Sequence, residues 1–486
     1  MLLRRLAATA SAPSSRFSLP PTIRQILARP SPTEEPATIS GWIKSIRKQK
    51  NVSFAVITDG SSAEGLQAVL TKGKDDELLR KLTNGAAVRF TGRLVKSPGA
   101  GQSIELLVDQ SREGKIQLLG ECPPETYPIQ KKDLTTEYLR DHVHLRARTS
   151  RIAAMLRLRD GLKREMDNWF EAQGFYFCNT PIITGNDAEG AGETFRLEKI
   201  QASHPAIASP QEVTPPSEFF SRPAFLTVSH QLHLEALATA ISRVYTLSPC
   251  FRAERSLTSR HLAEFWMLEA EWVLPDGDGV QGICDLTEGL LKDTVGAVIG
   301  NQDMDLLWKD REGSMRQALL DAVQSHQPWA RMTYTDAIME LEKAHFSAPF
   351  EYEPKWGRSL KSEHERWLAE KLICGPVFVT DYPAALKPFY MRANDDERTV
   401  ACLDLLVPYT AEIVGGSVRE ERLDVLQQKM GDHGENDAWY LDLRKYGGAP
   451  HAGFGMGFER LISWITGIEN IRECIPMPRW TGRMLL

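Results

Sequence analysis

The sequence predicts an α+β protein of two domains: a small β-barrel, then a larger domain in which helices flank an antiparallel sheet. Two observations carry this prediction. Short runs that alternate apolar and polar residues fill the first 120 positions, which is typical of an all-β domain. After a Pro-bearing stretch, long helical patterns alternate with strand-like runs and one clear hairpin. A chain of 486 residues is long enough for two or three such domains.

The composition is that of an ordinary globular protein, with 42% hydrophobic and 25% charged residues. A net charge of −6 argues against binding nucleic acid over the whole surface, so any RNA contact requires local basic patches. No run of 18 apolar residues is present, and we expect no membrane partner. Seven cysteines without a CxxC pair fit neither a disulfide framework nor a zinc site, which favours reduced thiols.

The N-terminal segment, residues 1–33, has an unusual composition. It contains five Arg among Ala, Ser and Leu, but no Asp or Glu. An acid-poor, Arg-bearing segment is typical of an organelle transit peptide, whereas a secretory signal needs a continuous apolar core that Arg and Ser interrupt here. We predict a cleavable transit peptide to the mitochondrial matrix over 1–33, cut before Pro20, with a merely disordered tail as the alternative.

Residues 37–120 have the pattern of a small closed barrel. A single helical stretch, 74–83, separates the third and fourth of six short strand-like runs, which cover 37–49, 52–60, 65–71, 86–98, 102–109 and 115–120. Such strands around one helix describe a barrel of the OB type, which binds single-stranded nucleic acid with aromatic platforms beside basic groups. Arg47 ends the first strand and Phe54 opens the second. Taken alone, Phe54 is better explained as barrel core than as a platform for RNA.

A linker is predicted at 121–150, because the Pro-bearing run 120–128 marks a domain boundary and polar, basic residues follow it. The larger domain, 151–486, opens with apolar residues at helical spacing over 151–173, and Gly174 is a plausible stop. The next run, 175–185, is predicted to be a strand. Its Pro181 suits a sheet edge or an interface better than the middle of a sheet.

Two segments of the larger domain are predicted to be insertions. Residues 203–217 are small and Pro-rich, which is typical of a disordered surface loop. Residues of about 275–346 contain helical stretches at 286–324 and 334–346. We expect this helical insertion to have a packing role.

The central hairpin carries groups suited to a nucleotide. Two strand-like runs flank the polar turn SLTSRHL, which predicts an antiparallel pair with Arg252 and Glu254 on one face and Phe265 on the partner strand. The guanidinium can grip a phosphate in a forked contact, the carboxylate can accept from an adenine amino group, and the ring offers a stacking plane. Arg260 and His261, on the turn, could reach the outer phosphates. A single Arg–Glu pair, however, is better explained as a surface ion pair.

A glycine-rich strand near the C-terminus gives a second nucleotide-binding feature. Gly453, Gly455 and Gly457 alternate, so that one strand face bears no side chains and a flat ligand can press against it. Arg460 should project from the first turn of the helix that follows. A glycine strand alone is weak evidence, but its combination with the hairpin is strong.

The two features resemble motifs 2 and 3 of the class II aminoacyl-tRNA synthetases. Residues 250–272 contain the pattern FRAE(x)5RHLAEF of motif 2, residues 449–466 resemble motif 3, and the helix and strand at 151–184 resemble motif 1. The barrel resembles the anticodon-binding domain of the aspartyl, asparaginyl and lysyl subgroup, and the segment after it is nearest to the asparaginyl branch. The resemblance covers nearly the whole chain after residue 36. It implies an ATP- and Mg²⁺-dependent ligase that charges tRNA, and a homodimer formed through motif 1.

The resemblance also implies roles for individual residues. The implied catalytic residues are Arg252, Glu412 and Arg460, and the implied Mg²⁺ ligands are Glu412 and Asp404. The implied ATP-binding residues are Arg252, Glu254, Arg260, His261, Phe265, Gly455, Gly457 and Arg460. The implied amino-acid-binding residues are Glu189, Gln231, Glu235 and Arg419. The implied anticodon contacts are Arg47, Phe54 and Gln67, with Phe54 stacking on the middle base.

Asparagine is expected as the amino acid, in preference to aspartate. A pocket for aspartate must neutralise a carboxylate, and the aspartyl enzymes typically place a Lys where this chain has Leu234. A pocket for asparagine needs one donor and one acceptor, which Arg419 and Glu235 can supply. Gly415 agrees, because the aspartyl enzymes often carry Ser there. The expected substrates are therefore L-asparagine, ATP and tRNA(Asn).

Three alternatives compete with this reading. The first is an aspartyl enzyme, or a non-discriminating one that also places aspartate on tRNA(Asn). The second is a catalytically inactive, synthetase-like RNA-binding protein, which would be expected to have lost some of the residues above. The third is a synthetase-like asparagine synthetase, but those enzymes lack an N-terminal barrel.

Overall fold

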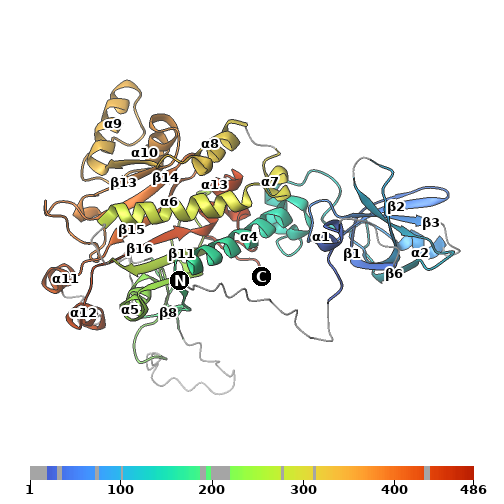
Figure 1. Ribbon diagram of the computed structural model, residues 1–486, viewed down its shortest axis with the longest axis horizontal. Helices are drawn as coiled ribbons and strands as arrows, with labels where there is room; N and C mark the ends of the chain where they lie inside the picture. The colour runs from blue at the N-terminus through green and yellow to red at the C-terminus, as the bar shows by residue number, and fades with distance from the viewer. Residues whose placement is uncertain are drawn as a thin grey trace, which may run out of the picture. The chain divides into compact units, whose positions relative to one another are not determined.

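The computed structural model describes residues 19–29, 36–71, 76–99, 102–185, 193–198, 219–274, 279–309, 313–431 and 438–486. The chain divides into two compact units, Met1–Thr149 and Ser150–Leu486 (Figure 1). The first is a β-barrel and the second a sheet flanked by helices, so the predicted α+β fold class is confirmed. None of the described helices is long and apolar enough to cross a membrane.

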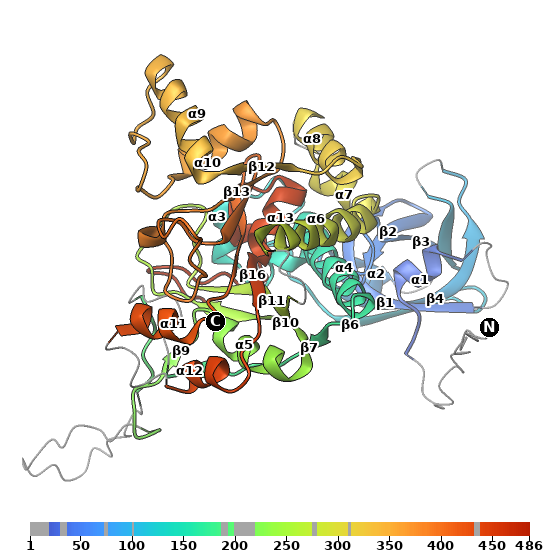
Figure 2. The same cartoon turned by 60° about the vertical axis from the view of Figure 1, so that its left-hand side comes forward.

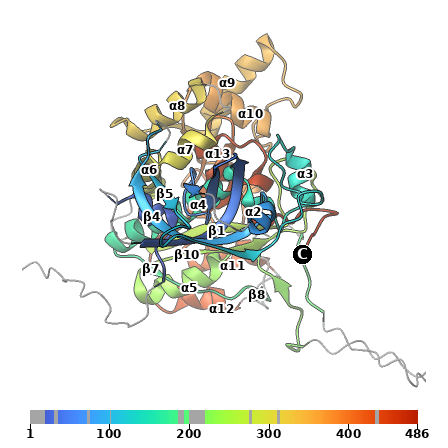
Figure 3. The same ribbon diagram turned by 90° about the vertical axis from the view of Figure 1, so that its right-hand side faces the viewer.

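The barrel of the first unit is closed by its first strand. Strands follow the order β1-β2-β3-β5-β4, and β4 pairs back onto β1 and also pairs with β6. Figure 3 labels β1, β4 and β5 of this barrel. Alternate residues of these strands point inward and form one apolar core. The elements are β1 (Pro36–Lys48), β2 (Val52–Thr58), β3 (Leu66–Thr71), α2 (Asp76–Lys81), β4 (Ala87–Lys96), β5 (Ile104–Val108) and β6 (Lys115–Gly120). The OB-type barrel was thus predicted correctly.

A short helix, α1 (Ile23–Leu27), corrects the extent of the predicted N-terminal extension. Its Ile23 and Ile26 are fully buried in the barrel core, and Ile23 N donates to Asp59 Oδ2 at 2.8 Å. The residues of α1 therefore belong to the folded unit, although the predicted extension reached residue 33. The expected cut before Pro20 is compatible with this boundary, and residues 1–18 lie outside the described part of the chain.

The predicted linker contains ordered turns that cluster with the barrel. Helix α3 (Thr136–Asp141) is followed by a 3₁₀ turn, η1 (Arg146–Arg148). Arg148 lies over two rings, 5.6 Å from the centroid of Trp42 and 5.7 Å from that of Tyr127. These cation–π contacts tie the linker to β1.

The second unit is built on an eight-stranded sheet in the order β12-β13-β14-β15-β16-β11-β10-β7. Its outermost pairs, β12–β13 and β10–β7, are parallel, and the inner pairs are antiparallel. The strands are β7 (Tyr176–Phe177), β10 (Arg243–Phe251), β11 (Glu264–Val273), β12 (Ala330–Thr333), β13 (Val377–Thr380), β14 (Cys402–Val407), β15 (Ala411–Val418) and β16 (His451–Gly457). A separate pair consists of β8 (Ile183–Thr184) and β9 (Phe225–Leu226).

Helices cover the sheet, and the largest apolar core joins one of its faces to α4, α6 and α13 (Figure 2). A second core lies under α9 to α12. The helices are α4 (Ser150–Ala172), α5 (Gln231–Ile241), α6 (Gly279–Val298), α7 (Gln302–Leu307), α8 (Gly313–Gln324), α9 (Tyr334–Ser347), α10 (Ser362–Trp367), α11 (Leu423–Met430), α12 (Ala438–Lys445) and α13 (Phe458–Thr466).

Two expectations about this unit were wrong in part. The segment 275–346 is not simply a helical insertion, because α6 belongs to the main core and β12 pairs in parallel with β13. The single strand expected over 175–185 is split into β7 and β8, since Pro181 has no N–H to continue a ladder. Its first part does lie at a sheet edge. The insertion expected over 203–217 lies outside the described residues.

Candidate active site

The predicted hairpin is present, but its first strand ends earlier than the sequence pattern indicated. β10 and β11 pair antiparallel, with Cys250 opposite Phe265. Strand β10 ends at Phe251, so Arg252 and Glu254 follow it in extended chain and are not strand residues. One more backbone bond, from Arg252 N to Ala263 O at 3.0 Å, carries the pairing past the strand end. This bond fixes the position of the Arg252 backbone, and with it the starting point of the Arg252 side chain.

Successive side chains of β11 face the apolar core and the candidate site in turn. Leu268, Ala270 and Trp272 point into the main apolar core. Their neighbours Met267, Glu269 and Glu271 point to the opposite face, where they line a cavity of about 390 Å³. The carboxylates of Glu269 and Glu271, on alternate residues of β11, thus face one pocket.

The glycines of β16 leave room on the same face. A side chain at Gly455 would meet Met267 Sδ at 3.2 Å, and Gly455 and Gly457 line the cavity. Gly453 differs from them, because the carboxylate of Glu271 occupies the space where its side chain would be. We expected three glycines to face a ligand. Only Gly455 and Gly457 do so, and Gly453 accommodates a protein side chain.

The start of α13 is tied to the hairpin through Glu459. Its Oε2 accepts from Trp266 N at 2.9 Å, and its Oε1 lies 2.7 Å from Arg159 Nη1 on α4. Glu459 is buried, which raises its pKa, while the charge of Arg159 acts in the opposite direction. These contacts hold the next residue, Arg460, over the cavity, as the sequence predicted.

One end of the cavity gathers the cationic groups predicted for phosphates. Arg252 lies over the ring of Phe265, with 5.3 Å from Cζ to the ring centroid. Arg260 Nη1 donates to Ser362 Oγ on α10 at 2.9 Å, and His261 Nε2 is 3.2 Å from a Glu254 carboxylate oxygen. All of these residues except Ser362 line the cavity, so the structure brings the predicted ATP-binding side chains together.

Carboxylates surround these cations. Arg460 Nη1 lies 3.3 Å from Glu412 Oε2, and Lys387 Nζ donates to both oxygens of Asp404, at 2.9 and 2.8 Å. Burial raises the pKa of Asp404, and the nearby Glu412 adds to this shift. Burial would also raise the pKa of Glu412, but the charges of Arg460 and Lys387 outweigh it and lower that pKa. Glu412 is therefore held ionised beside the phosphate-facing guanidiniums.

Glu412 and Asp404 also share one neighbourhood. A Cβ placed on Gly415 would lie 3.4 Å from Glu412 Oε1 and 3.6 Å from Asp404 Oδ1. Gly415 therefore keeps the space between the two carboxylates open toward the cavity. Oxygen donors in this arrangement are of the kind that Mg²⁺ prefers.

The other end of the cavity contains a buried ion pair. Arg419, which lies just after β15, is bound by both oxygens of Glu271, and its Nε lies 3.3 Å from Oε2. Its Nη1 donates to Ser417 Oγ at 2.7 Å, and Cζ lies 5.3 Å from the ring centroid of Tyr390. Burial raises the pKa of Glu271, and Arg419 opposes that shift. Gln231 lines the same part of the site, as predicted.

Glu235 does not contact the cavity, which corrects the expectation that it would face an amino acid. The helix α5 starts at Gln231, and Glu235, one turn later on the same face of the helix, is fully buried and accepts from Gln231 Nε2 at 3.0 Å. Leu234, the other residue of the asparagine argument, packs with Ala238 and Val244. Glu189 lies outside the described residues.

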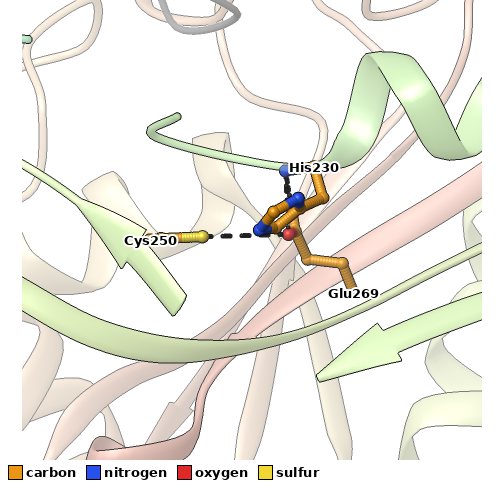
Figure 4. Close-up of side chains that lie close together, drawn as sticks. All are labelled: His230, Cys250 and Glu269. Carbon is orange, nitrogen blue, oxygen red and sulfur yellow. Dashed lines mark hydrogen bonds between the residues drawn. The ribbon is translucent and has the colours of Figure 1, made fainter. Parts of the chain in front are cut away.

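A group of three potential metal ligands, His230, Cys250 and Glu269, lies beside the cavity (Figure 4). Both ring nitrogens of His230 already have partners: Nδ1 lies 2.7 Å from Thr180 Oγ1 and Nε2 lies 3.1 Å from Pro249 O. A carbonyl oxygen only accepts, so Nε2 carries the proton and Nδ1 accepts from the hydroxyl. The ring therefore has no lone pair for a metal. Its backbone N–H instead holds Glu269, at 2.9 Å.

The three residues expected to contact RNA share one outer face of the barrel. Arg47 pairs with Phe54 across β1 and β2, and Phe54 and Val56 point to the same side of β2. Gln67 lies opposite Val56 on β3, and its side-chain amide donates to Glu105 at 3.0 Å. Phe54 is half-buried, outside the inward-facing core set.

Several residues of the site were not found from the sequence. Glu269 and Glu271 sit in the hairpin itself, where their alternation with core residues was a usable signal. Lys387 and Glu365 carry no local signal, because they reach the site from loops and helices far away in the chain. Glu365 lies 3.8 Å from Arg260 Nη1, and burial together with Glu412 raises its pKa to about 7.

Comparisons with known proteins agree with this geometry. The family described as tRNA synthetases class II (D, K and N) matches residues 135–481, and the OB-fold nucleic acid binding domain matches residues 37–119. The asparagine–tRNA ligase of Thermosynechococcus vestitus is 45% identical over 451 residues, covering 92% of this chain and 95% of that protein. The corresponding protein of Microcystis aeruginosa is 44% identical over 464 residues, with 94% and 98% covered.

Solved structures give the same result. The asparaginyl-tRNA synthetase of Pyrococcus horikoshii, complexed with asparaginyl-adenylate, superposes with a TM-score of 0.79 at 28% identity, covering 93% of this chain and 96% of that one. The Entamoeba histolytica asparaginyl-tRNA synthetase, also with asparaginyl-adenylate, gives 0.76 at 26% identity, with 93% and 97% covered. From the barrel, the hairpin, the glycine strand and these matches it follows that the chain belongs to the class II tRNA synthetases of the D, K and N group.

Proposed function

We propose that this synthetase activates L-asparagine with ATP and transfers it to tRNA(Asn). The observation that carries the proposal is the single cavity that joins the Arg252–Arg460 phosphate end to the Arg419–Glu271 ion pair. A nucleotide and a small polar amino acid can thus lie end to end in one site. Relatives named asparagine–tRNA ligase, at about 45% identity over most of the chain, support the choice of amino acid.

The reaction needs no protein nucleophile. The asparagine carboxylate attacks the α-phosphorus of ATP, a new O–P bond forms, and the bond to the pyrophosphate leaving group breaks. A hydroxyl of the terminal ribose of the tRNA then attacks the carbonyl carbon of the adenylate, an ester bond forms, and AMP leaves with the oxygen of the broken bond. Catalysis is therefore a matter of holding the two reactants in line and stabilising the charge that develops on phosphate.

The phosphate end supplies the required charges. Arg252 can bind the α-phosphate in a forked contact while Phe265, now under its guanidinium, stacks on adenine. Arg260, His261 and Arg460 can take the β- and γ-phosphates, because all three line the same end of the cavity. Glu254 would accept from the adenine amino group once it leaves His261. The alternative of an inactive RNA-binding protein does not account for this complete set.

Glu412 and Asp404 would hold Mg²⁺, since both expose carboxylate oxygens around the opening above Gly415. The ion, when bound, neutralises charge on the phosphates. Lys387 offsets the charge of Asp404 in the unliganded site, and Arg460 offsets that of Glu412. Glu412→Gln should raise the Mg²⁺ concentration needed for half-maximal activity, and an unchanged requirement would remove Glu412 from this role.

The side-chain amide of asparagine needs a donor and an acceptor. Arg419 can donate to the amide oxygen. The acceptor for the amide NH2 is one of the two carboxylates of β11 that line the cavity, Glu269 or Glu271, in place of Glu235. Glu269→Gln and Glu271→Gln, made separately, should identify it: loss of asparagine affinity in neither variant would exclude both.

The barrel is proposed to read the anticodon of tRNA(Asn). Arg47, Phe54 and Gln67 share one outer face of β1 to β3, as an aromatic platform beside polar groups requires. A homodimer is proposed through β7 and the following segment, whose large apolar side chains are exposed: Tyr176 by 63%, Phe177 by 44%, Ile182 by 40% and Ile183 by 46%. Such a patch at a sheet edge is typical of an interface.

We further propose that the synthetase acts in mitochondria. The support is the acid-free, Arg-bearing composition of the first 33 residues, of which those before Pro20 precede the folded unit. A fluorescent protein fused behind residues 1–22 should enter mitochondria, and uniform cytosolic fluorescence would contradict the proposal.

The proposed reaction can be tested on two neighbouring arginines. Arg252→Ala should reduce asparagine-dependent exchange of pyrophosphate into ATP by two orders of magnitude or more, since it removes a contact to the reacting phosphate. Arg255→Ala is the matched control, because Arg255 is exposed three residues away and does not line the cavity. Equal exchange rates in the two variants would contradict the assigned role of Arg252.

A further inference from the structure

A cluster of polar side chains lies directly behind the amino-acid end of the cavity. We call Glu235, Tyr440, Arg444 and His451 the Glu235 cluster. They come from three elements far apart in the sequence, α5, α12 and β16, and α12 lies beside α5 (Figures 1 and 2). Their exposed fractions are 0, 0, 6 and 3%, and none of them lines the cavity. The catalytic steps proposed above do not use them.

The cluster converges on the carboxylate of Glu235. Tyr440 donates its hydroxyl to Oε1 and Oε2 at 2.9 and 2.7 Å, and Arg444 Nη2 donates to Oε2 at 2.8 Å. His451 Nε2 lies 2.9 Å from Oε2, and Gln231 Nε2 donates to Oε1 at 3.0 Å. Burial works against ionisation of Glu235, but the hydrogen bond of His451 and the charge of Arg444 outweigh it, so its pKa is lowered. Glu235 is thus a buried, ionised and fully hydrogen-bonded carboxylate.

The same cluster holds Arg419 from behind. Arg419 Nε lies 3.9 Å from Glu235 Oε1, and it also donates to Glu271 Oε2 at 3.3 Å. The backbone around Arg419 is also held, because Arg419 N donates to His451 O and Arg444 Nε donates to Glu420 O, both at 2.9 Å. The Arg419 guanidinium therefore has two carboxylates close by: that of Glu271, which lines the cavity, and that of Glu235, which does not.

This arrangement bears on the choice between two almost isosteric amino acids. We propose that Glu235 is a specificity-determining residue that disfavours aspartate through its charge, without touching the amino acid, and that Tyr440 and Arg444 are positioning residues that hold it against Arg419. The inference rests on the proposed function and adds to it. With Glu235 and Glu271 already balancing nearby cations, the second carboxylate of aspartate would enter a site with no spare positive charge. The neutral amide of asparagine meets no such penalty.

The effect should be large enough to measure. Two like charges about 7 Å apart, at the effective dielectric of a protein site, repel enough to change an affinity on the order of tenfold or more. No direct contact is needed. A gain of aspartate use is also a result that misfolding or loosened packing cannot produce.

The test compares variants in pyrophosphate exchange with asparagine and with aspartate. Glu235→Gln removes the charge but keeps the size, and it should raise kcat/KM for aspartate relative to asparagine about tenfold or more, with KM for ATP unchanged. Tyr440→Phe removes one donor and keeps the charge, and should raise KM for asparagine several-fold without changing that ratio. Tyr446→Phe, on an exposed tyrosine six residues away, should match the wild type.

Each outcome decides a separate claim. A folded Glu235→Gln variant with an unchanged ratio would overturn the charge mechanism. If that variant does not fold, Tyr440→Phe decides. A KM for asparagine equal to that of Tyr446→Phe would overturn the inference, and a KM for asparagine higher than that of Tyr446→Phe would support it. A wild-type protein that activates no asparagine would instead contradict the proposed function.

Discussion

At the scale of single residues, this site shows how strand alternation and glycine decide what a pocket can hold. Met267, Glu269 and Glu271 reach the cavity only because every second residue of β11 faces it, while their neighbours complete the main core. Gly455 leaves a flat wall for a nucleotide, and Gly453 leaves room for Glu271. The carboxylate that binds Arg419 therefore depends on a missing side chain on the neighbouring strand.

Glu365 gives a prediction about pH. Burial and the nearby Glu412 raise its pKa to about 7, from an ordinary value near 4.5. Between these values the folded protein binds more protons at this position than the unfolded chain, so this group's contribution to stability falls as pH rises through that window. Glu365→Gln removes the titration. The free energy of unfolding of the variant minus that of the wild type, measured by urea titration, should therefore increase from pH 5 to pH 8. A difference that does not change with pH would contradict the raised pKa of Glu365.

Among the structural elements, the hairpin β10–β11 and the strand–helix unit β16–α13 were predictable because their signals are local. Alternation, a polar turn, spaced glycines and an apolar helix stripe all lie within short stretches of the sequence. Residue types inside these stretches could therefore be placed at the site. Gln231 and Glu235 lie one turn apart on the same face of α5, but Glu235 is buried against Tyr440 and Arg444 of α12, a distant partner that no local pattern reveals.

Elements whose role depends on distant partners were harder to predict. Helix α1 was assigned to the N-terminal extension because its composition is acid-free, although the spacing of Ile23 and Ile26 buries both in the barrel. Lys387 reaches the cavity, and Glu365 reaches Arg260 at its lining, from segments far away in the chain. A short strand such as β12 exists because β13 is available as its partner, which the residues ARMT alone do not reveal.

The edge strand β7 gives a prediction at the scale of an element. Phe177→Asp places a charge within the exposed apolar edge and should shift the proposed homodimer to the monomer, because burying an unpaired charge in an interface is costly. Phe346→Asp is the control, as Phe346 is 93% exposed on α9, outside this edge. Sedimentation gives the oligomeric state of both variants and of the wild type. A dimeric Phe177→Asp variant would show that the dimer interface lies elsewhere, and a monomeric wild type would contradict the proposed homodimer.

The whole molecule separates two tasks between its two units. The cavity is lined only by residues of the second unit, whereas Arg47, Phe54 and Gln67 belong to the first. Amino acid activation should therefore be independent of the barrel, and only transfer to tRNA should need it. This division follows from the two compact units and could be predicted from the composition change around residue 120.

Phe54→Ala tests that division. Loss of one stacking platform should weaken tRNA binding by about 1 to 3 kcal/mol, which raises KM for tRNA roughly five- to 150-fold. Pyrophosphate exchange, which needs no tRNA, should stay at the wild-type rate. Leu119→Ala, at an exposed position on β6, is the control for barrel stability. Unchanged charging by Phe54→Ala would exclude Phe54 as an anticodon contact.

The most direct test of the central claim is the charging of purified tRNA(Asn) and tRNA(Asp) with labelled asparagine and labelled aspartate. One cavity that pairs a phosphate-binding end with an amide-binding end predicts asparaginyl-tRNA(Asn) as the dominant product. Comparable amounts of aspartyl-tRNA would contradict the proposed specificity, and no charged product of either kind would contradict the proposed reaction.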